Sequence, residues 1–189
     1  MEYNLSEIME HCDPFVQFLK RMNKKTFFVR GSHKKNDNII LKGKHITSRK
    51  PLDIPEYIHD SLNSIYRLKF GWDVRGGIFC FAVFNIEDEI QDLSYGKSYI
   101  FLPVGEFRYC YASEIFDLYQ HYLLFKKKDL ENSDDKFINS IDYQNDNLDK
   151  IVFDDSYSNR SFEVMFDCEK YYLLDLSFLD ELKGLIWNY

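Results

Sequence analysis

The chain has 189 residues, 45% of them hydrophobic and 29% charged, a length and balance that predict one globular domain with a sizeable core. No run reaches the roughly 18 apolar residues of a membrane span. The N-terminus lacks a signal-peptide pattern, and the four scattered cysteines show no metal-binding spacing. These features argue against a membrane protein and predict a cytoplasmic chain with reduced thiols, no metal and no membrane partner.

The formal net charge is −7, but the charge is distributed unevenly along the chain. Residues 20–50 contain eleven Lys or Arg and one Asp, a net charge of +10, so the remaining residues carry −17. This basic segment predicts contact with phosphate groups, including a possible nucleic acid partner; a solvated face that pairs with the acidic surface is the alternative. The candidate contacts are Lys34, Lys35, Lys42, Lys44, Arg49 and Lys50.

Residues 1–23 form a predicted N-terminal helical segment. Apolar residues recur at helical spacing from Leu5 to Met22, with Ser6 as a possible cap, and Pro14 should kink this helix or split it in two. The β-prone run Thr26–Arg30 follows, and Gly31 lets the backbone turn where a ligand can approach closely. An arginine at a strand end beside a glycine is therefore a candidate binding position.

The middle of the chain predicts a helix and three strands. Pro55 suits the first turn of a helix that ends at Gly71, and the apolar run Ile78–Phe84 predicts the central strand. Two more strands are expected at Ser98–Leu102 and Phe107–Tyr111, separated by a turn at residues 103–105.

The last third predicts a helix from Glu114 to Lys127, capped by Ser113, and then an acidic, Asn-rich loop over residues 132–149. Two strands, Phe162–Phe166 and Tyr171–Asp175, precede a C-terminal helix within residues 177–189. Because strands and helices do not alternate regularly, the fold class is predicted to be α+β. We expect a single domain, with a mixed, mostly antiparallel split β-sheet flanked by helices within residues 25–176.

Several common catalytic motifs are absent from the sequence. It contains no phosphate-binding G-x-x-x-x-G-K loop, no dinucleotide G-x-G-x-x-G, no G-x-S-x-G elbow and no H-E-x-x-H. The histidines show no ligand spacing either. The sequence therefore points away from these nucleotidase, dehydrogenase, esterase and metalloprotease chemistries.

Three separated segments together resemble the ADP-ribosyltransferase superfamily: Phe28–Asn36 with Arg30-Gly31-Ser32, Phe70–Ala82, and Ser161–Phe166 with Glu163. They resemble its first conserved strand, the floor strand of its NAD crevice and its late strand with the catalytic glutamate. The resemblance implies NAD as substrate and no metal, and Arg30, Gly31, Ser32, Phe79 and Tyr95 as NAD contacts. It implies that Glu163 acts on the ribose beside Arg30, which requires the two to face one cleft.

The resemblance leaves the activity open between two alternatives. One is transfer of ADP-ribose to a host protein or nucleic acid, because a carboxylate can stabilise the charge that develops on the ribose. Since Phe79–Ala82 offers no hydroxyl where toxin-like members have one, the alternative is an inactive module of the same fold. Similar arrangements occur in tailed-bacteriophage proteins, which implies a virion or host-protein partner and the host cytoplasm or virion as location.

Overall fold

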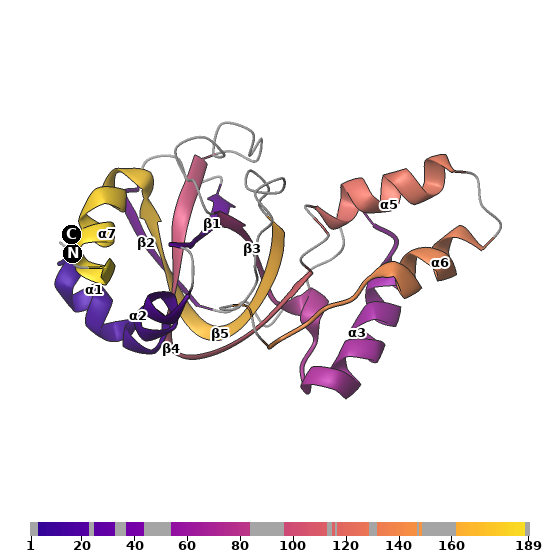
Figure 1. Ribbon diagram of the computed structural model, residues 1–189, viewed down its shortest axis with the longest axis horizontal. Helices are drawn as coiled ribbons and strands as arrows, with labels where there is room; N and C mark the ends of the chain where they lie inside the picture. Colours follow the sequence, from indigo (N-terminus) through magenta and orange to yellow (C-terminus); the bar gives the residue numbers. More distant parts are fainter. Residues whose placement is uncertain are drawn as a thin grey trace.

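The computed structural model shows an α+β protein in which a small antiparallel sheet lies between two groups of helices (Figure 1). It describes residues 4–22, 25–32, 37–43, 54–83, 97–112, 115, 117–128, 132–146, 148 and 162–187. Six α-helices and five strands lie in these residues. No helix among them is long and apolar enough to cross a membrane.

The sheet closes on itself as a barrel. Its strands are β1 (Phe27–Ser32), β2 (Ile39–Gly43), β3 (Ile78–Val83), β4 (Lys97–Ala112) and β5 (Phe162–Asp175). They follow the order β2-β5-β3-β1-β4, and β4 also pairs with β5, so four strands close the barrel and β2 extends it from β5. The predicted α+β class is thus confirmed, while closure replaces the expected split sheet.

The two longest strands correct the predicted strand boundaries. The predicted strand pair around residues 103–105 is one strand, β4, and the predicted pair at 162–166 and 171–175 is one strand, β5. Residues 103–105, which were predicted to form a turn, lie instead at an irregularity in the pairing of β4 with β5. Pairing between β4 and β5 shifts register between Val104 and Phe107, and Gly105 has φ +68°.

Three helices cover one side of the barrel, where the two chain termini also lie (Figure 1). These are α1 (Leu5–His11), α2 (Asp13–Arg21) and α7 (Leu179–Trp187), which follows a 3-10 turn at Leu176–Phe178. Pro14 stands in the first turn of α2, so the predicted split of the N-terminal helix is confirmed. The cap of α1 is Asn4, whose side chain accepts a hydrogen bond from the Ser6 backbone N–H.

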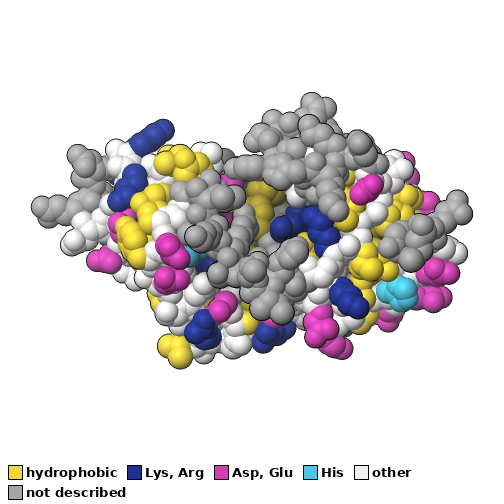
Figure 2. All heavy atoms as spheres, turned by 180° about the vertical axis from the view of Figure 1, so that it is seen from behind, with side chains coloured by type: hydrophobic (Ala, Val, Ile, Leu, Met, Phe, Trp, Pro, Cys, Tyr) yellow, Lys and Arg dark blue, Asp and Glu magenta, His cyan; other side chains and the backbone are white. Residues whose placement is uncertain are grey.

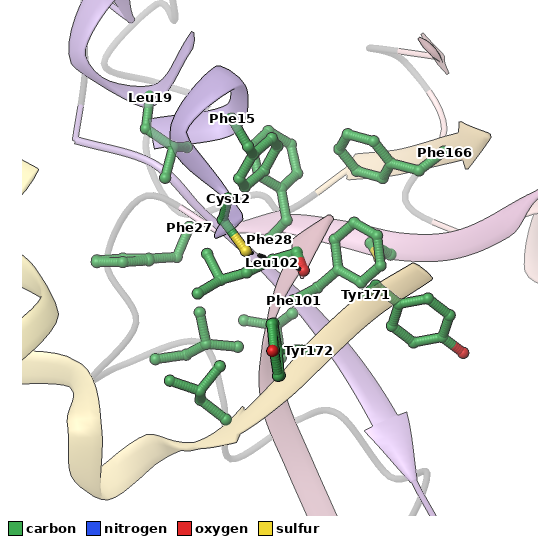
Figure 3. Packing of buried hydrophobic residues seen from close by; sticks show 14 of the residues in the cluster. Cys12, Phe15, Leu19, Phe27, Phe28, Phe101, Leu102, Phe166, Tyr171 and Tyr172 are labelled. Carbon is green, nitrogen blue, oxygen red and sulfur yellow. Dashed lines mark hydrogen bonds between the residues drawn. The ribbon is translucent and has the colours of Figure 1, made fainter. Parts of the chain in front are cut away.

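Aromatic side chains fill the barrel interior (Figure 3). Phe28 and Phe166 come from β1 and β5, which are not neighbouring strands, yet their ring centroids are 5.0 Å apart. Phe101 of β4 lies 4.9 Å from Phe166, and Phe15 of α2 contacts all three rings. These contacts define the inner face of each strand.

The helices on the other side are α3 (Glu56–Phe70), α5 (Leu118–Lys127) and α6 (Ser133–Ser140). They form a second apolar cluster that packs on the outer face of the barrel through Cys110 and Met165. The loop predicted at 132–149 is wrong in part, because it contains α6, whose Phe137 is fully buried. Helix α5 begins later than predicted, with Asp117 as its cap; Ser113 lies outside the described residues.

Candidate functional site

Glu163 lies in a buried polar cluster on the outer face of the barrel. Its side chain is 1% exposed, and its Oε1 is 2.5 Å from Nη1 of Arg75, which is also buried. The Tyr143 hydroxyl donates a hydrogen bond to the same carboxylate, and Arg75 Nη1 donates to the Tyr143 hydroxyl oxygen at 2.8 Å. The carboxylate is therefore enclosed by its own partners.

Arg75 reaches the cluster from a 3-10 turn, Val74–Gly76, which lies between α3 and β3. Its backbone N–H donates to Oδ1 of Asn63 in α3 at 2.7 Å. The turn is thus attached to the helix, while its arginine side chain extends to β5. Helix and sheet meet at this residue.

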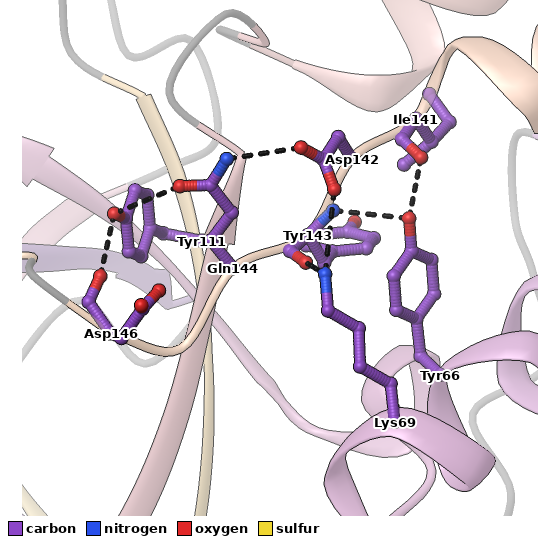
Figure 4. A network of polar contacts seen from close by, with 8 residues as sticks. All are labelled: Tyr66, Lys69, Tyr111, Ile141, Asp142, Tyr143, Gln144 and Asp146. Atoms are coloured by element: carbon purple, nitrogen blue, oxygen red, sulfur yellow. Dashed lines mark hydrogen bonds and ion pairs between the residues drawn. The ribbon is translucent and has the colours of Figure 1, made fainter.

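Tyr143 belongs to the extended segment that follows α6, and α3 holds this segment at two points (Figure 4). Lys69 Nζ donates to the Tyr143 carbonyl at 2.7 Å, and the Tyr143 backbone N–H donates to the Tyr66 hydroxyl at 3.1 Å. The next residue, Gln144, pairs with Tyr111 of β4 through two backbone hydrogen bonds. These contacts fix the tyrosine between the helices and the barrel.

The electrostatics of the cluster favour a protonated tyrosine and a charged arginine. Burial raises the pKa of Tyr143 well above its ordinary value, more than the charge of Arg75 lowers it. Burial by itself would lower the pKa of Arg75, but Tyr143 and Glu163 together raise it above its usual range. The arrangement is that of a buried, hydrogen-bonded ion pair that joins the helices to the sheet.

Arg30 lies on the opposite face of the sheet from Glu163. In β1 it is two residues from Phe28 and therefore shares the inner face. Glu163 is three residues from Phe166 in β5 and therefore points outward. Arg30 and Glu163 therefore cannot line one cleft on one face of the sheet. The expectation that these two residues face one cleft is wrong.

The guanidinium of Arg30 is half-buried and sparsely paired. Nη1 donates to the Phe79 carbonyl at 2.8 Å, while Nε is buried without a hydrogen-bond partner. The ion pairs among the described residues do not include Arg30. Burial raises the pKa of both Cys80 and Tyr171, and the charge of Arg30 opposes the rise at each, so all three groups share one electrostatic environment inside the barrel.

Of the other predicted NAD contacts, the structure describes the backbone of Gly31 and Ser32 and the whole of Phe79. Gly31 and Ser32 end β1, where their backbone pairs with the start of β4. Phe79 packs edge-on against Phe81 at 4.7 Å on the outer face, so its carbonyl approaches Arg30 and its ring does not. Tyr95 lies outside the described residues.

Of the predicted phosphate contacts, only Lys42 is in the described part of the chain. It lies in β2 opposite Tyr171 and is half-buried. The others, Lys34, Lys35, Lys44, Arg49 and Lys50, lie outside the described residues. On the described surface in Figure 2, Lys and Arg side chains gather beside a hollow near the middle of the face, where apolar side chains are visible.

Arg75, Tyr143 and Tyr171 are the residues that sequence patterns did not single out. Arg75 stands between a tryptophan and two glycines, a pattern typical of a turn, and Tyr143 stands in the stretch predicted to be a loop. Only the pairing of distant segments brings them to Glu163 or Arg30, because 88 residues separate Arg75 from Glu163.

No group of three or more metal-ligating side chains occurs among the described residues. No protein-family model, curated protein or solved structure matches this chain.

Proposed function

We propose that this protein binds a phosphate-bearing ligand at the inner face of the barrel, with Arg30 as the anchoring cation, and acts as a binding module rather than through Glu163. The observation that supports it is the state of Arg30. It is half-buried, its Nε has no hydrogen-bond partner, and none of the described carboxylates pairs with it.

The buried Nε of Arg30 is costly without an acceptor, since an unsatisfied buried donor costs about 1–3 kcal/mol relative to a paired one. A phosphate supplies several strong acceptors and a compensating charge, and it can bind the planar guanidinium through two parallel hydrogen bonds. Binding of such a ligand would satisfy the free donor. This reasoning favours a ligand site over a purely structural role for Arg30.

The resemblance of β1 and β3 to ADP-ribosyltransferases makes NAD the first ligand to test. Catalysis by Glu163 receives no support from its geometry, because the carboxylate is occupied by Arg75 and Tyr143 on the outer face. We therefore favour the inactive-module alternative over transfer of ADP-ribose. A virion protein or host protein would be a partner of such a module.

The test is a thermal-shift titration with NAD, ADP and inorganic phosphate. A ligand that binds only the folded protein stabilises it by about 2.7 kcal/mol at a hundredfold excess over its Kd. We expect Arg30→Gln to abolish the shift, Arg30→Lys to reduce it, and Arg21→Gln to leave it unchanged. Arg21 is a matched control because it is exposed, at the end of α2, in the same basic segment.

Three results would decide against parts of the proposal. Absence of any shift at millimolar ligand in the wild type would refute the site. Transfer of label from NAD to proteins of a lysate would restore the enzymatic alternative. Oligonucleotide binding that falls steeply with salt and persists in Arg30→Gln would assign the basic residues of segment 20–50 to nucleic acid instead.

A further inference from the structure

One stripe along the exposed side of α3 carries no charged residue and is largely apolar, and exposed charged residues border it. The helix buries Ile58, Leu62 and Tyr66 against the second cluster. On its exposed side it presents five residues at helical spacing, here called the α3 face: Tyr57, Ser61, Ser64, Ile65 and Leu68. Ser61 is half-buried and the other four are exposed. Leu68 is 92% exposed, the highest value among the exposed large hydrophobic residues.

The hydroxyl hydrogens of the two serines of the α3 face are used within the helix. Ser61 Oγ donates to the Tyr57 carbonyl and Ser64 Oγ to the Asp60 carbonyl, each at 2.8 Å. The serine hydroxyls therefore need no hydrogen-bond acceptor from a partner, and their small size permits another helix to approach closely. A face of this kind suits an apolar helical partner.

We infer that the α3 face is a self-association surface, on which α3 of a second copy packs antiparallel. In that arrangement a two-fold axis passes near the middle of the helix, close to Ser61 and Ser64. Each Leu68 then meets the Tyr57 ring of the other copy, while the serines face one another at the centre. Tyr57 and Leu68 at the two ends and the small serines between them, with Ile65 beside them, make the face complementary to itself.

The charges beside the α3 face favour the same arrangement. Asp60 and Arg67 border it on the same flank, near opposite ends of the helix, and both are exposed. An antiparallel pair places Asp60 of each copy beside Arg67 of the other, so that two opposite-charge contacts form by symmetry. A parallel pair would place these residues on opposite flanks, out of reach of one another.

Arg67 can make this contact without losing its partner within the chain. It pairs with Asp73 through Nε and Nη2. Its Nη1 is the donor that a carboxylate of the second copy would contact, since a guanidinium carries five N–H donors.

The expected dimer is weak. One helix of 15 residues provides a contact only about 22 Å long at 1.5 Å per residue. Such a contact buries less than the roughly 1,600 Å² of a standard interface. Association should therefore be seen only at high protein concentration.

Sedimentation velocity of the full chain, from about 10 µM to about 1 mM, tests the inference at concentrations suited to a small interface. We expect concentration-dependent dimers in the wild type and none in Leu68→Glu. Leu124→Glu is the matched control, because Leu124 is a 56% exposed leucine on α5; this variant should dimerise normally. Circular dichroism of each variant verifies that it is folded.

Charge reversal tests the antiparallel geometry. Asp60→Arg or Arg67→Asp alone should weaken the dimer about tenfold, because each contact occurs twice. The double variant, with both substitutions, should recover most of the loss. A wild type that stays monomeric throughout, equal loss of dimer in Leu68→Glu and Leu124→Glu, or a double variant weaker than both single variants would overturn the inference.

Discussion

At the scale of single residues, Glu163 is a buried carboxylate held by two partners. Together with Arg75 and Tyr143 it forms a closed set of charge and hydrogen bonds between the outer face of β5 and the helices. An intact buried ion pair contributes little to the free energy of unfolding, but removal of one member leaves an uncompensated buried charge. The cluster is therefore a point at which we expect substitutions to lower stability.

The first prediction concerns this carboxylate. Glu163→Gln should lower the free energy of unfolding by about 3–5 kcal/mol, because Arg75 then stays charged and buried without a counter-charge. Tyr143→Phe should cost less, about 1–3 kcal/mol, because it removes the hydroxyl and leaves the ion pair. Urea denaturation measures both.

The control for this prediction lies on the same strand. Glu169 of β5 is exposed, so Glu169→Gln should change the unfolding free energy by no more than about 0.5 kcal/mol. If Glu163→Gln proved as harmless as Glu169→Gln, the structural role assigned to Glu163 would be wrong.

At the scale of elements, the contact between the Trp72–Gly77 turn and β5 sets where β3 begins. Gly77 is packed so closely that a Cβ atom there would lie 2.8 Å from Trp72 Cζ3 and 2.9 Å from the Phe166 carbonyl oxygen. The Phe166 carbonyl oxygen belongs to the backbone of β5 and cannot rotate away. A side chain at position 77 must therefore displace the turn from the sheet.

The second prediction compares two glycines. Gly77→Ala should destabilise the fold by about 1–3 kcal/mol through overpacking against backbone atoms. Gly184→Ala, inside α7 with no atom within 4 Å of the added Cβ, should instead stabilise it by up to about 1 kcal/mol, the helix preference of Ala over Gly. Thermal unfolding monitored by circular dichroism distinguishes the opposite signs. Equal shifts of the two variants would contradict the assigned packing.

At the scale of the whole molecule, aspartates on both sides of the barrel hold separate elements together. Asp134 of α6 pairs with Lys126 of α5 at 2.7 Å and accepts a hydrogen bond from Tyr57 of α3. These partners lower the pKa of Asp134. Asp175, at the end of β5, pairs with Lys97 of β4. Burial would raise the pKa of Asp175, but its hydrogen bonds with Lys97 and Ser177 lower that pKa overall.

The third prediction is a loss of stability in acid. Both carboxyl groups have a folded-state pKa below the ordinary value of about 3.9. The contribution of each carboxyl group to the free energy of unfolding is therefore complete above the ordinary pKa and is lost as pH falls through the folded-state pKa. The free energy of unfolding should fall between about pH 5 and pH 2.

Urea denaturation across this pH range checks the prediction. Asp134→Asn and Asp175→Asn should each flatten the pH dependence, because each removes one group that gains a proton on unfolding. Asp180→Asn is the control, because Asp180 is 94% exposed. A pH dependence unchanged by the first two variants would refute the assignment.

Much of the local structure was determined by the sequence alone. Pro14 begins a second helix, Gly71 ends α3 with φ +76°, and the apolar runs at Phe27 and Ile78 form strands, because each depends on neighbouring residues or backbone preference. The α+β class and the aromatic core follow from composition and pattern. The helix α6 was missed, since contacts with distant segments sustain it in a polar stretch: Phe137 is buried in the second apolar cluster, and Asp134 bonds to α3 and α5.

The tertiary structure decided closure of the barrel, the continuity of β4 and β5, and the surroundings of Arg30 and Glu163. Successive side chains of a strand point to opposite faces, so the sequence fixes which side chains of one strand share a face. It does not fix which face of one strand lies on the same side of the sheet as a given face of another strand. That correspondence depends on register between segments far apart in the chain, which local preferences do not encode. Val29 pairs with Phe81, and Phe81 pairs with Glu163, so these three share the outer face and Arg30 turns inward, away from the glutamate.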